Sequence, residues 1–204
     1  MQIDPDTGAV QNIVVLQYNP ETLTRTLQVQ SVAPEHQNRS EALRLTGPPI
    51  ESFKLDAEID ATDQLEQPSL YPNATQYGIL PLLTALELMI YPTSTQLLGN
   101  NTLAQSGTLE ISPMEAPLVV LVWGVKRVVP VLVSSLTFTE EAFDPALQPI
   151  RVKASIECKV LTSSDLPLQH VGGTLYIAYR QAVEQLATLV TSSDVRPLGL
   201  EHLP

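Results

Sequence analysis

Hydrophobic and polar residues alternate along much of this chain, as they do in β-strands that bury one face and leave the other in water. The clearest case is residues 51–59, where apolar side chains occupy every second position. Residues 150–161 repeat the pattern, with Cys158 on the apolar side. These segments predict an antiparallel sheet. Its strands are expected at residues 12–18, 22–29, 51–59, 108–111, 118–123, 128–139 and 150–161.

Two other segments have helical patterns. Residues 77–90 are continuously apolar, Pro81 fits only in a first turn, and Tyr91-Pro92 provides a stop, so a buried internal helix is expected there. Apolar residues recur at helical spacing over 175–190, which predicts an amphipathic helix near the C-terminus. The preceding Gly172-Gly173 is expected to be a flexible hinge. Loops are expected at residues 31–49 and 92–107.

These elements predict a mainly β fold with six or more strands, one internal helix and one helix appended. Strand runs of this length suit a small antiparallel β-barrel or sandwich, with the internal helix covering an open end. The length of 204 residues allows one ordinary domain with an extension. We expect the β domain to cover residues 1–171 and a helical extension to cover residues 172–204.

Charge and composition exclude several classes of protein. The chain has 22 acidic and 11 basic residues, and a net charge of −11 argues against nucleic-acid binding. No apolar run approaches the roughly 18 residues of a membrane span. The first residues lack the features of a signal peptide, and Cys158 is the single cysteine. We therefore expect a soluble protein that is made in the reducing cytoplasm and does not insert into membranes.

Candidate chemistry is sparse. His36, His170 and His202 stand far apart without neighbouring metal ligands, and the acidic run from Asp56 to Glu66 lacks the glycine and terminal glutamate of a calcium loop. No nucleophile motif occurs, and a mid-strand Cys158 is poorly placed for activation. The expectation is a protein without enzymatic activity, metal or cofactor.

Three regions of the sequence carry motifs that resemble those of a known protein family. Residues 16–24 resemble the Phe-x-Phe-Asn-Pro-Glu-x-Leu strand and turn of contractile injection system tube-type proteins. The alternating strand that runs into Asp60-Ala-Thr-Asp63 and the hairpin around residues 135–151 resemble later parts of the same family. The matching positions are Tyr18, Asn19, Pro20, Leu23, Trp123, Gly124, Phe143, Asp144, Pro149 and Arg151.

Within that group the chain is most similar to the adaptor, or tube initiator, of extracellular contractile injection systems. The resemblance implies a tube-type barrel with one helix, six copies in a ring and no catalytic residues. Such a ring joins the spike hub to the inner tube and nucleates tube assembly, so the implied partners are further copies, the inner tube protein, the spike hub and baseplate or sheath components. Unlike many adaptors, the chain is expected to lack a peptidoglycan-binding LysM module.

The C-terminal helix is expected to serve assembly, because its apolar stripe needs a partner surface. Trp123 is expected to be a packing anchor in the core. Two alternatives remain open: an inner tube subunit of the same machine, and a β-sandwich that binds a ligand without catalysis, although only 5% of the residues are aromatic. The residues of the apolar stripe are Leu175, Tyr179, Val183, Leu186 and Val190.

Overall fold

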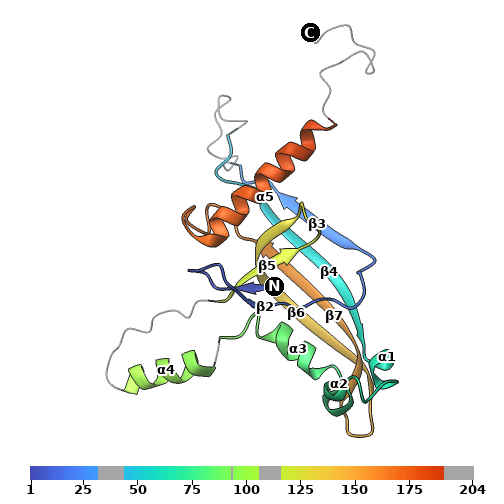
Figure 1. Ribbon diagram of the computed structural model, residues 1–204. Coiled ribbons are helices and arrows are strands. Elements are labelled where there is room, and N and C mark those ends of the chain that lie inside the picture. Colours follow the sequence, from blue (N-terminus) through green and yellow to red (C-terminus); the bar gives the residue numbers. More distant parts are fainter. Residues whose placement is uncertain (32–43, 93, 106–115, 191–204) are drawn as a thin grey trace.

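The computed structural model describes residues 1–31, 44–92, 94–105 and 116–190 (Figure 1). The described part of the chain is mainly β and is built on one seven-stranded sheet. The strands are β1 (Gln2–Ile3), β2 (Val10–Asn12), β3 (Leu23–Gln28), β4 (Ile50–Asp60), β5 (Leu118–Val122), β6 (Val128–Phe143) and β7 (Pro149–Val160). Their order across the sheet is β2-β1-β5-β6-β7-β4-β3, and every neighbouring pair is antiparallel.

The three longest strands, β4, β6 and β7, form the middle of the sheet. Leu55, Ile156 and Leu136 lie side by side across these strands. From Glu51 to Ile59 every second side chain of β4 is buried, which confirms the strand predicted from the alternation. Val120, which is fully buried, packs in a second, smaller cluster with Ile3 and Leu118. Most of the other large, fully buried side chains of the sheet belong to one main core: Phe53, Ile59, Val129, Val131, Val152 and Val160.

Five helices accompany the sheet in the described residues: α1 (Thr62–Leu65), α2 (Pro72–Tyr77), α3 (Leu80–Glu87), α4 (Ser94–Gln105) and α5 (Val171–Thr188). The internal helix expected over residues 77–90 is shorter, because Gly78 separates α2 from α3 with a φ of 59°. A side chain at Gly78 would also come within 2.2 Å of the Pro149 carbonyl oxygen. Leu83 and Leu86 of α3 are buried against the sheet, as expected.

Two other expectations for local structure were wrong. Residues 92–107 were expected to be a loop, but they contain α4. The strand expected over residues 12–18 is confined to Val10–Asn12, and the rest of that segment leaves the sheet. The strand expected at 108–111 and most of the loop at 31–49 lie outside the described residues.

α5 is anchored in the core of its own chain. The hinge expected at Gly172-Gly173 was wrong, because both glycines are buried in the first turn of the helix. His170 begins this helix, and its Nδ1 accepts a hydrogen bond from the Gly172 amide at 3.0 Å. Tyr176 and Tyr179 then pack in the main core. The expected boundary at 171/172 therefore coincides with the start of α5, whose first half shares the core of the sheet.

Candidate functional site

The free edge of β3 is the first candidate surface for assembly. Within the described residues, β3 pairs only with β4 and lies at one end of the strand order, while β2 lies at the other. Leu27 is 50% exposed, and Val29 just beyond the strand is 66% exposed. Natural sheets usually protect such edges with charged residues, proline or bulges. β3 has one charged side chain, Arg25, and that side chain is engaged elsewhere.

Arg25 belongs to a three-residue cluster that ties β3, β4 and α5 together. Its Nε donates to Glu51 Oε1 at 2.6 Å and its Nη2 donates to Tyr179 Oη at 2.9 Å. The Tyr179 hydroxyl in turn donates to the same Glu51 oxygen at 2.7 Å. Glu51 is only 3% exposed, so its carboxylate depends on these two donors.

The electrostatics of the cluster follow from this geometry. Burial and the hydrogen bond to Glu51 raise the pKa of Tyr179 to about 12, so the phenol stays protonated and keeps donating. The hydrogen bond to Glu51 also raises the pKa of Arg25. The charge of Arg25 is thus neutralised beneath α5, and it does not protect the β3 edge from pairing with another strand.

Residues 13–18 are the second candidate surface. Among the described residues, none of their backbone groups takes part in a backbone–backbone hydrogen bond. Ile13 is 60% and Val15 73% exposed, while Val14 and Leu16 turn inward. Gln17 holds the segment in place, since its Oε1 accepts a hydrogen bond from the Asp60 amide at 3.0 Å. A segment with the composition and alternation of a strand therefore has no strand partner in the part of the chain that the structure describes.

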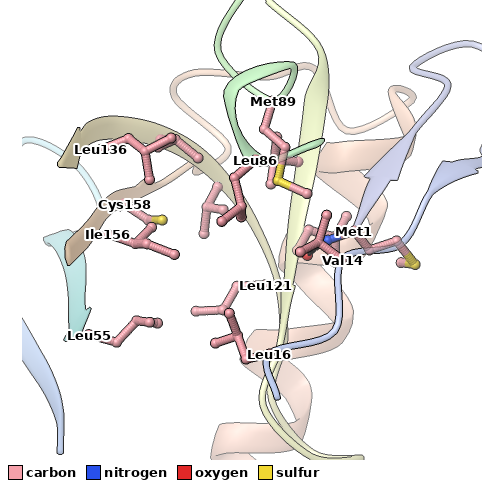
Figure 2. Close-up of a pocket in the computed structure, with 14 residues that line it drawn as sticks. Met1, Val14, Leu16, Leu55, Leu86, Met89, Leu121, Leu136, Ile156 and Cys158 are labelled. Carbon is pink, nitrogen blue, oxygen red and sulfur yellow. Dashed lines mark hydrogen bonds between the residues drawn. The ribbon is translucent and has the colours of Figure 1, made fainter. Parts of the chain in front are cut away.

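Beneath residues 13–18 lies an apolar cavity of about 90 Å³ (Figure 2). Val14 and Leu16 face Leu55 and Ile156 of the sheet across it, and side chains from the end of α3 close another side. Pockets that hold cofactors or drug-sized ligands are about 300–1,000 Å³. This cavity is much smaller, and it is a packing gap between the sheet and the segment that covers it.

Cys158 lines this cavity and is 4% exposed, as its predicted place on the apolar side of β7 required. Burial raises the pKa of its thiol to about 11. At pH 8 we expect a thiolate fraction about two hundredfold below that of an ordinary exposed cysteine. A thiol reagent such as DTNB should therefore react slowly with the folded chain and fast after denaturation in guanidinium. Equal rates in the two states would contradict the buried position.

The residues that match family motifs do not form one site. Tyr18, Asn19 and Pro20 lie in the turn before β3, beside the outward-facing Asp56 and Glu58 of β4. Leu23 begins β3 and is partly buried against the core.

Trp123 and Gly124 form the start of the β5–β6 turn, where Gly124 has a φ of 79°. The Trp123 amide donates to the Arg127 carbonyl at 2.8 Å. Trp123 was expected to be a core anchor, but its side chain is only half-buried, because the turn extends past the end of the core.

The remaining motif residues lie at the far end of the β6–β7 hairpin. Asp144 accepts hydrogen bonds from the amides of Ala146 and Gln148, both at 2.8 Å, and so shapes the hairpin turn. Arg151 pairs with Asp60 at 2.7 Å. Pro149 is buried and Phe143 is half exposed. These positions have visible structural roles in turns and strand pairing.

The apolar stripe of α5 is divided between the core and the solvent. Tyr179 is buried, and Leu175 and Val183 pack partly against the chain's own core clusters. At the end of the stripe, Leu186 is 45% and Val190 is 86% exposed, so these two side chains are free to contact another protein. The stripe was expected to dock on a neighbouring subunit or a baseplate protein without forming part of the core, and this was wrong for Tyr179.

The Arg25–Glu51–Tyr179 cluster was missed from the sequence, although two signals were present. Arg25 interrupts the apolar side of its strand, and Glu51 occupies the same side of β4 as Phe53 and Leu55. Two opposite charges, one on the apolar face of each of two neighbouring strands, are the pattern of a buried ion pair. Nothing in the sequence placed Tyr179 beside them, because α5 is more than 120 residues away.

Among the described residues, no group of three or more His, Cys, Asp or Glu side chains is placed to hold a metal ion. In the same part of the chain, no helix has both the length and the apolar character needed to cross a membrane. A comparison with protein-family models finds no match for this chain, and a comparison with curated protein sequences finds none either.

Proposed function

We propose that this chain is a ring-forming structural component of a phage-tail-like contractile injection system. In this proposal it is the adaptor between the spike hub and the inner tube, in six copies, and it nucleates the tube at the baseplate. The motif resemblance supports the choice of machine. The observation that carries the assembly role is that, among the described residues, the chain presents both a strand edge without a pairing strand and a β-prone segment without a strand partner.

These two features complement each other between copies. The β3 edge has free backbone donors and acceptors on its outer side, and residues 13–18 have free backbone groups of their own. If the segment of one copy pairs with the β3 edge of the next, each copy gives one surface and receives the other. Such a head-to-tail contact makes a ring when its rotation closes. A ring closed in this way would also join the open sheets of its copies into one continuous barrel of the tube type.

The remaining surfaces fit contacts with other layers of the particle. Leu189 and Val190 follow α5 and are 77% and 86% exposed, so they offer an apolar surface for a baseplate or sheath component. An inner tube subunit of the same machine is the second candidate, because the free edges serve stacked rings equally well. Copy number in the assembled particle separates the two: one ring for an adaptor, many for a tube subunit.

Placing a charge on the β3 edge tests the assembly role. Leu27→Lys is expected to leave the chain folded, since this side chain is half exposed, and to abolish rings, because edge lysines oppose strand pairing. Electron microscopy of the chain mixed with inner tube and spike proteins gives the measurement. The matched control is Leu132→Lys, because Leu132 is 42% exposed but lies on β6, where it pairs with Lys159 of the central strand β7 and not at the β3 edge. Rings that form equally well with Leu27→Lys would count against this interface.

A further inference from the structure

A groove lined by basic and aromatic side chains lies between α5, β3 and the β5–β6 turn. Its volume is about 400 Å³. Lys126 and Arg127 come from the turn, and Trp123 stands beside them. Val183 and Leu186 of α5 provide an apolar wall. The groove thus combines positive charge with apolar surface, in a chain whose net charge is −11.

The two cations of the turn have no carboxylate partner. Neither Lys126 nor Arg127 forms an ion pair with any residue in the described part of the structure, a property that they share there with Arg180 of α5. By contrast, many other basic side chains are held by carboxylates, and the pairs are Arg25–Glu51, Lys54–Glu157, Arg151–Asp60, Lys153–Glu141 and Lys159–Asp165. In an acidic protein, two neighbouring cations left without carboxylates indicate a surface that meets negative charge from outside.

The opposite end of the long strands presents the complementary surface. Asp63 and Glu66 of the α1 region are exposed, and neither takes part in an ion pair within the described residues. Beside them Leu70, Tyr71 and Tyr77 are 68%, 45% and 44% exposed. Figure 1 shows the β5–β6 turn beside α5 at one end of the sheet, and α1 with α2 at the other.

We propose that the groove of one copy binds the acidic α1–α2 end of a second copy. Carboxylates of Asp63 and Glu66 would face Lys126 and Arg127, while the exposed aromatic side chains of α2 would meet Trp123 and the apolar wall of α5. The two surfaces differ and lie at opposite ends of the strands (Figure 1), so the contact joins unlike ends of two copies. This inference rests on the proposed function and deepens it, because it names a second contact between copies.

Charge reversal at the two ends tests the contact. Lys126→Glu/Arg127→Glu reverses the groove, and Asp63→Lys/Glu66→Lys reverses the acidic end. Each variant alone is expected to raise the concentration for half-association by about tenfold or more, because like charges then face each other. An equimolar mixture of the two variants is expected to associate again, because the acidic groove of one meets the basic end of the other.

Sedimentation velocity of the full chain at low and high salt gives the measurement, since contacts between exposed charges weaken as salt rises. Trp123 is the single tryptophan, so its fluorescence reports directly on the occupied groove. Circular dichroism establishes that each variant is folded. The control is Lys54→Glu/Lys153→Glu, which changes the net charge equally on exposed strand positions away from the groove and should leave association unchanged.

Three outcomes would overturn this contact: a wild-type chain that stays monomeric at low salt, a folded variant that associates like wild type, or a mixture that stays dissociated. These outcomes are distinguishable from failure of the proposed function. Rings that form with tube and spike proteins but ignore the charge variants would reject the groove contact alone. Association that is salt-sensitive and restored by mixing, in a chain that never co-assembles with those proteins, would support the contact and reject the adaptor.

Discussion

Replacing Gly173 by alanine is expected to lower the free energy of unfolding by about 3 kcal/mol or more. A β-carbon at this position would lie 2.2 Å from the Pro167 carbonyl oxygen and 3.0 Å from the Leu168 Cα. Both atoms belong to the backbone, and the Pro167 carbonyl also accepts a hydrogen bond from the His170 amide that shapes the start of α5. The clash therefore has to be relieved by moving the helix away from the sheet.

Thermal unfolding monitored by circular dichroism measures this effect, and a fall in Tm of about 6–12 °C corresponds to it in a chain of this size. Gly99→Ala is the matched control, since Gly99 lies inside α4 and a β-carbon there meets nothing within 4 Å. The control should be neutral or stabilising by about 0.5–1 kcal/mol. If Gly173→Ala melts like wild type, the close approach of α5 to the Pro167 backbone is not present in solution.

Removing the guanidinium of Arg25 is expected to have the second large effect, a loss of about 2–3 kcal/mol in Arg25→Ala. The change leaves the carboxylate of Glu51 buried with the Tyr179 hydroxyl as its remaining donor. The expected loss stays below that of a fully buried pair because the Arg25 side chain is 31% exposed and solvent weakens the attraction.

A second variant separates lost attraction from buried charge. Arg25→Ala/Glu51→Gln removes the charge that has lost its partner, so it should be more stable than Arg25→Ala alone. Lys54→Ala serves as the control, because its pair with Glu157 is half exposed and should contribute little to stability. Denaturant unfolding of the four proteins gives the comparison. A double variant no more stable than Arg25→Ala would show that the buried charge of Glu51 is not the source of the loss.

Local pattern was enough to determine most of the sheet. Alternation located β3, β4 and β7, and apolar runs located β5 and most of β6, because burial of one strand face imposes a period of two on the residues themselves. The place of Cys158 on the apolar side followed from the same rule and is confirmed. The mainly β class and the amphipathic helix α5 were likewise determined by residues close together in the sequence.

The tertiary structure alone decided which of these elements have partners. Residues 13–18 have the composition of a strand, yet strand formation requires a pairing partner, and none of the described residues pairs with them. The glycines in the first turn of α5 would be a hinge in an isolated peptide, but residues 166–168 leave no space for side chains there and so give them a packing role. The same holds for Arg25, Glu51 and Tyr179, which are far apart along the chain and become one cluster only when α5 crosses the sheet. Pattern along a sequence reports which face of an element is buried, whereas contacts between distant elements, and the edges left without contacts, depend on how the whole chain is packed.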